Sequence, residues 1–100
     1  MKTFTIKRGD TDPALRYALQ PETVDLSGAS VVFNMTGRVV RAPARIVSAS
    51  PPVVEYAWQP GDTDEAGRKS AEFEVTYAGG AIGTFPNADH LVINILPDLG

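Results

Sequence analysis

Residues 70–85 of the chain read SAEFEVTYAGGAIGTF, and this stretch decides the fold. Its first half alternates apolar and polar side chains, so that Ala71, Phe73 and Val75 share one side. Successive side chains of a strand point to opposite faces of a sheet, so the alternation predicts a strand with one buried face. Gly79-Gly80 can reach positive φ at little cost, which predicts a hairpin between this strand and the next.

The same period-two alternation recurs along the rest of the chain, separated by turn residues. The segments that carry it are 3–7, 15–19, 31–36, 38–48, 53–58 and 90–95. Short strands at such regular spacing are typical of a sandwich or a barrel rather than a single open sheet. We therefore predict one all-β domain over residues 1–100, with about seven to nine short strands.

One segment, DPALRYALQP at 12–21, fits two interpretations. Asp12 and Pro13 are good residues for the start of a helix, but the next proline would limit that helix to about eight residues. Leu15 and Tyr17 alternate equally well with polar neighbours, as a strand requires. We favour the strand.

Composition excludes several classes of function. The chain has 100 residues, a net charge of -3 and no cysteine. The missing cysteines rule out disulfides, thiolate metal sites and cysteine nucleophiles. The acidic balance and the scattered basic residues argue against a nucleic-acid partner. No stretch approaches the roughly 20 apolar residues that cross a bilayer, and the start lacks a signal peptide, so we expect no membrane partner and folding in the cytoplasm.

The tetrapeptide GDTD occurs twice, at 9–12 and 61–64. Asp and Thr side chains commonly cap local backbone amides between strands, so we interpret both copies as turns. The alternative is a calcium site, because closely spaced carboxylates are the ligands that calcium prefers. Its candidate ligands would be Asp10, Asp12, Asp62 and Asp64. Neither copy has the twelve-residue EF-hand pattern, so we expect no metal and no cofactor.

Other residues offer little chemistry. His90 is the only histidine, too few for a zinc site, and no serine lies in a nucleophile elbow. Tyr56 and Trp58 alternate within an apolar strand, so we expect them in the core; on the surface they would form a platform for a sugar. We expect a protein that is not an enzyme and has no small-molecule substrate.

Four stretches together resemble one known family in their order and spacing. They are FTIKRGDT at 4–11, VDLSGASVVFNM at 24–35, YAWQPGDTDEAGRKSAEFEVTYAGG at 56–80 and TFPNADHLVINI at 84–95. The chain resembles the phage baseplate upper protein N-terminal domain family over essentially its whole length. The resemblance implies an immunoglobulin-like antiparallel β-sandwich, and it supports the interpretation of both GDTD copies as turns.

The same resemblance implies a function. It suggests a non-enzymatic structural or assembly protein of a tailed phage or prophage virion, located in the tail, baseplate or neck, or decorating the capsid. Such a protein is made in the bacterial cytoplasm and docks on other virion proteins in several symmetric copies. The alternative from a different class is a carbohydrate- or cell-surface-binding module, calcium-dependent or not, which would need Trp58 or Tyr56 to face solvent.

The segment 38–48 is our candidate for the docking surface. A proline within a strand is tolerated at a sheet edge, and edge strands can accept a strand from a partner. The alternation predicts that Val40 faces the core. The partner-binding candidates are Val39, Arg41, Pro43 and Arg45. The terminal segments 1–5 and 96–100 are candidate arms.

Overall fold

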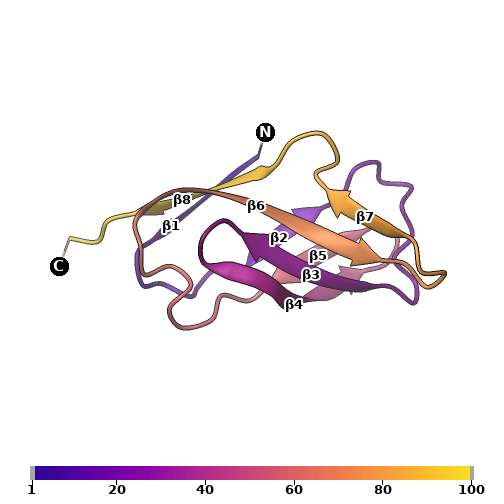
Figure 1. The fold of residues 1–100 in the computed structure, drawn as a ribbon, viewed down its shortest axis with the longest axis horizontal. Coiled ribbons are helices and arrows are strands. Elements are labelled where there is room, and N and C mark those ends of the chain that lie inside the picture. Colours follow the sequence, from indigo (N-terminus) through magenta and orange to yellow (C-terminus); the bar gives the residue numbers. More distant parts are fainter. Residues whose placement is uncertain (1, 100) are drawn as a thin grey trace.

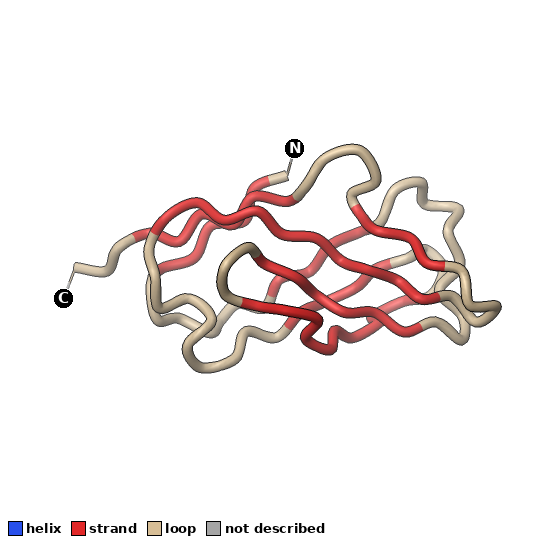
Figure 2. The backbone as a smooth tube through the Cα atoms, viewed as in Figure 1, coloured by secondary structure: helices blue, strands red, loops and turns tan. Residues whose placement is uncertain are grey.

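The computed structural model describes residues 2–99, which contain eight strands and no helix. The strands are β1 (Thr3–Lys7), β2 (Leu15–Ala18), β3 (Ser30–Met35), β4 (Val39–Ser48), β5 (Val53–Tyr56), β6 (Gly67–Thr76), β7 (Ile82–Phe85) and β8 (Leu91–Leu96). The prediction of an all-β chain with seven to nine strands is confirmed (Figures 1 and 2). The described residues include no helix long and apolar enough to span a membrane.

The strands follow one continuous hydrogen-bonded path. Its order is β1-β8-β6-β3-β4-β5-β2, and β7 pairs with β6 beside that path. The strands form two layers, the first of β1, β8, β6, β7 and β3 and the second of β5 and β2. Strand β4 joins them, because its residues 39–44 pair with β3 and its residues 45–48 pair with β5. The layers are therefore parts of one barrel-like sheet rather than two separate sheets of a sandwich (Figure 1). The pairing of β1 with β8 is parallel, and the other pairings are antiparallel.

The ambiguous segment 12–21 contains a strand. Strand β2 pairs antiparallel with β5, with Leu15 opposite Tyr56 and Tyr17 opposite Val54. Leu15 and Tyr17 are buried while their polar neighbours are exposed. The helix alternative is wrong because a helix would turn one of these two side chains away from the core, whereas the strand buries both.

An aromatic cluster holds the two layers together. Phe33 of β3 is fully buried and stacks on Tyr56 of β5 at 4.4 Å between ring centroids. Trp58 meets the edge of Phe33 at 5.7 Å, and Phe73 of β6 lies 5.1 Å away. Aromatic pairs at such distances add about 0.5–1.5 kcal/mol each beyond their buried area. This cluster is therefore the centre of the core.

A β-bulge interrupts the pairing of β3 with β4. Phe33 lies opposite Ala42, but Met35 lies opposite Val39, so β4 has an additional residue between these pairs. The extra residue reverses the alternation. Val39 is buried, whereas Val40 is 82% exposed. The prediction that Val40 faces the core is wrong, because side-chain periodicity alone does not reveal a bulge.

Candidate functional site

The second GDTD segment forms a turn fixed by Asp62. Its carboxylate accepts hydrogen bonds from the Tyr56 hydroxyl at 2.6 Å and from the Gln59 backbone N–H at 2.8 Å. Burial, the hydrogen bond and the negative charge of Asp62 all raise the pKa of Tyr56 above its ordinary value, and burial is the largest cause. Asp62 therefore has a structural partner in the core and a capping role in its own turn.

The two GDTD segments lie side by side. The buried Thr63 hydroxyl donates to the Asp10 carbonyl oxygen at 2.7 Å, and the Gly9 N–H donates to the Thr63 carbonyl oxygen at 3.0 Å. The second copy is confirmed as a turn, because the Asp64 N–H donates to the Gly61 carbonyl oxygen at 3.3 Å; a turn also leads into the first copy, where the Asp10 N–H donates to the Lys7 carbonyl oxygen at 3.1 Å. The bonds between the copies bring the two loops together, as the calcium hypothesis requires. Among residues 2–99, however, no three acidic or histidine side chains are placed to hold a metal ion, so Asp10, Asp12, Asp62 and Asp64 do not form a ligand set.

The two candidate aromatic residues belong to the core. Tyr56 is 2% exposed and Trp58 is 4% exposed, as the sequence predicted. The alternative of a sugar-binding module depended on one of these rings facing solvent. Neither ring is available as a stacking platform.

Of the four partner-binding candidates on β4, three are exposed and one is not. Val39 packs in the core, while Arg41, Pro43 and Arg45 face solvent. Arg41 forms an ion pair with Glu74 of β6 at 2.6 Å. Because of the bulge, Val40 takes the outward position that the sequence assigned to Val39.

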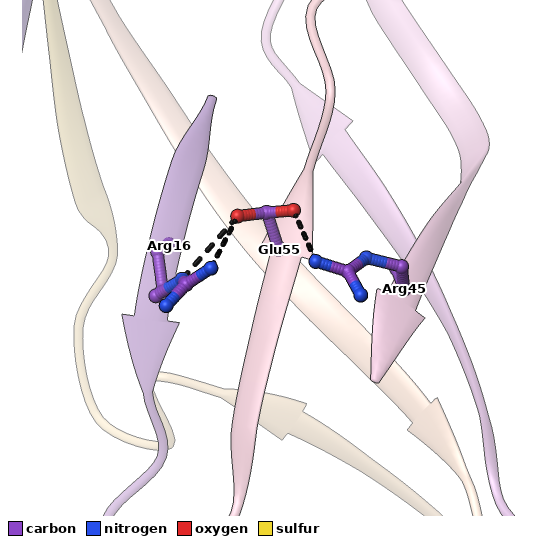
Figure 3. Close-up of polar contacts among 3 residues, drawn as sticks. All are labelled: Arg16, Arg45 and Glu55. Atoms are coloured by element: carbon purple, nitrogen blue, oxygen red, sulfur yellow. Dashed lines mark hydrogen bonds and ion pairs between the residues drawn. The ribbon is translucent and has the colours of Figure 1, made fainter. Parts of the chain in front are cut away.

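Arg45 belongs to a row of charges on the outer face of the second layer. Figure 3 shows Glu55 of β5 between Arg16 of β2 and Arg45 of β4. The ion-pair distances are 3.0 Å to Arg16 and 2.8 Å to Arg45. The hydrogen bonds from these two arginines lower the pKa of Glu55, and the bond from Arg45 has the larger effect. Arg45 is thus partly engaged within the chain, and its free donors remain available to a partner.

The backbone at the bulge has an unusual conformation. Among residues 2–99, Arg41 is the one residue other than glycine that has a positive φ, at 49°. Side chains of L-residues clash in this region, at a cost of about 1–2 kcal/mol. The Asn34 side-chain oxygen accepts the Arg41 backbone N–H at 2.8 Å, and the ion pair to Glu74 holds the guanidinium. Three strands therefore fix the bulge in place.

An open groove lies beside the bulge. It has a volume of about 560 Å³, and its walls come from β3, the β3–β4 turn, β4, β6 and the residues before β8. Asn34, Val40, Glu72 and His90 are among the side chains that line it. His90 donates its backbone N–H to the Asp89 carboxylate, which lowers the pKa of Asp89. The sequence did not indicate this groove, because its residues are distant in the chain.

The candidate arms pack partly against the body. Residues 3–5 pair with β8, and Arg8 forms an ion pair with Asp98 at 3.0 Å. Met1 and Gly100 lie outside the described residues. Leu99 is almost fully exposed.

We found no match to this chain among protein-family models, curated proteins or solved structures.

Proposed function

We propose that the chain is a non-enzymatic docking module of a tailed phage or prophage virion, in which it binds other virion proteins in several symmetric copies. The observation that carries the proposal is the segment 39–44 of β4, in which Val40, Arg41 and Pro43 are exposed while the backbone is held in a strained bulge. Strained backbone persists only where its surroundings fix it, and it is concentrated at functional sites. Here the bulge presents an apolar side chain, Val40, to solvent.

The mode of docking follows from how this edge is built. Among residues 2–99 no strand pairs with the outer side of residues 39–44, so the edge is open. It nevertheless has a bulge, a proline without an N–H, and the charged residue Arg41. Each of these features opposes the addition of another strand. We therefore infer that a partner contacts the side chains of β4 rather than extending the sheet.

Two further points support binding over catalysis. Asp62, the carboxylate with the most buried surroundings in the GDTD loops, is engaged by Tyr56 and Gln59. His90, the only histidine, lines a groove that shares no lining residue with either GDTD loop. The resemblance of the sequence to the phage baseplate family supports the placement in a virion.

Mass spectrometry of purified phage particles tests the proposal. Particles induced from the bacterium that encodes the chain would be purified through a density gradient and their proteins quantified against the major tail protein. We expect the chain in the particle at a copy number that is fixed relative to the major tail protein. Recovery of the chain in the soluble lysate, with none in particles, would overturn the proposal.

A further inference from the structure

The strands contain three carboxylates, of which two form ion pairs with arginine and one does not. Glu55, Glu72 and Glu74 all lie on outer faces of the sheet, half-exposed. Glu55 is neutralised by two arginines of neighbouring strands, and Glu74 by Arg41. Within residues 2–99, no lysine or arginine lies at ion-pair distance from Glu72. Its carboxylate therefore forms no ion pair within the described residues.

The strand register explains why Glu72 is open. On one side it lies opposite Asn34 of β3. On the other side β6 changes partners at this residue, because Ala71 pairs with Leu91 of β8 and Phe73 pairs with Phe85 of β7. Glu72 thus faces the gap between β7 and β8. The groove described above forms there, with Glu72 and His90 among its lining residues.

The groove has the chemistry to recognise a cationic side chain with an aliphatic stem. A carboxylate forms short, charge-assisted hydrogen bonds with lysine and arginine, about twice as strong as neutral ones. Lysine and arginine also pack their methylene groups along apolar surface while the charged end group stays in a polar environment. Val40 provides such a surface on the same groove.

We propose that this groove binds a lysine or arginine side chain presented by an extended segment of a partner virion protein. Glu72 accepts the hydrogen bonds of the cation, and Val40 contacts its aliphatic stem. The inference rests on the proposed docking function, for which it names the chemistry of the partner. The charge complementarity at Glu72 favours a basic segment over an acidic or a neutral one.

Nuclear magnetic resonance titration of the isotope-labelled full chain tests this inference. The probes are a five-residue peptide with a central lysine between valines, and two counterparts in which glutamate or norleucine replaces the lysine. We expect the lysine peptide to shift the amide signals of Asn34, Val40, Glu72 and His90 in a saturable way. Equal shifts from all three peptides, or shifts centred elsewhere, would overturn the inference. So would the absence of binding of the lysine peptide up to 10 mM, which corresponds to a binding free energy weaker than about 2.7 kcal/mol.

Two variants sharpen the test. Glu72→Gln keeps the size of the side chain and removes its charge, and it should weaken the lysine peptide about tenfold, as loss of one charge-assisted bond implies. Glu22→Gln makes the same charge change at an exposed residue between β2 and β3, and it should leave the affinity within about twofold. Well-dispersed spectra of both variants show that they are folded. Equal affinity of Glu72→Gln and the unchanged chain contradicts the inference.

The two proposals can fail separately. If the chain is present in particles and the lysine peptide does not bind the groove, docking stands and the basic partner segment is wrong. If the peptide binds in the groove and the chain is missing from particles, the virion function is wrong while the site remains.

Discussion

The bond between Tyr56 and Asp62 gives the sharpest prediction on stability. The hydroxyl donates to a carboxylate at 2.6 Å, and the Tyr56 ring is 2% exposed. Hydrogen bonds to charged groups contribute about 1.5–3 kcal/mol. Tyr56→Phe removes the donor but leaves Asp62 its bond from the Gln59 N–H, so we expect a loss near 2 kcal/mol. For about 100 residues this lowers the Tm by roughly 10 °C.

Asp62→Ala should cost more, about 3 kcal/mol, because it leaves both the Tyr56 hydroxyl and the Gln59 N–H without an acceptor. In a double-mutant cycle with Tyr56→Phe, measured by urea unfolding, the coupling should be about 1–2 kcal/mol. The matched control is Asp64→Ala, which changes an exposed carboxylate of the same GDTD copy and should cost less than about 0.5 kcal/mol. Additive losses would refute the reasoning, and so would a loss for Asp62→Ala that appears only when calcium is present.

The same bond has a pH signature. The pKa of Tyr56 is raised in the folded chain, whereas an unfolded tyrosine titrates near 10. Above that pH the unfolded chain releases a proton that the folded chain retains, so stability falls as pH rises past about 10. Tyr56→Phe should flatten this alkaline loss in Tm measurements between pH 9 and 11. Tyr17, whose pKa is also raised by burial, accounts for a residual slope.

Three further predictions concern other parts of the fold. Phe33→Ala removes the centre of the aromatic cluster and should cost about 3–5 kcal/mol by urea unfolding; a loss under 1 kcal/mol would contradict the assignment of the core. Arg41→Gly should be more stable than Arg41→Ala by about 0.5–1 kcal/mol, because both lose the ion pair and only alanine retains the strain of positive φ; the reverse order would show that the bulge is not strained. The pKa of Glu55 is lowered in the folded chain, so its ionised carboxylate stabilises the fold above about pH 4.3, and this stabilisation is lost as the pH falls through the lowered pKa. The Tm of Glu55→Gln should therefore decline less steeply in acid than the Tm of the unchanged chain. Parallel curves of Tm against pH would contradict this prediction.

The alternation of side chains was sufficient to predict most strands. In β6, Ala71, Phe73 and Val75 are buried as their period indicates, and in β2 the same period correctly favoured a strand over a helix. The alternation predicts burial because each strand has one face against the core, so that every second side chain along the strand is buried. The parallel pairing of β1 with β8 was not predicted, since the partner of a strand depends on contacts between the two ends of the chain.

The candidate site was predicted only in part. The segment 38–48 was chosen because of Pro43, and it does have an open edge, yet the bulge exchanged the roles of Val39 and Val40. A bulge is set by cross-strand hydrogen bonds, here that of Asn34 with the Arg41 N–H, and no local sequence signal marks it. Glu72 could be assigned to the outer face from its alternation. That it forms no ion pair within residues 2–99 depends on how β6 is paired with its neighbouring strands, which the sequence does not show.

Site-specific cross-linking at Val40 tests the central claim most directly. A photoreactive amino acid would replace Val40 in the chain expressed during phage assembly, and a second chain would have it at Thr23, in the exposed loop between β2 and β3. Illumination of the purified particles should join the Val40 position to one defined virion protein and give little product at Thr23. Particles that contain the chain and yet give no product at Val40, or the same products at both positions, would contradict a docking surface on β4.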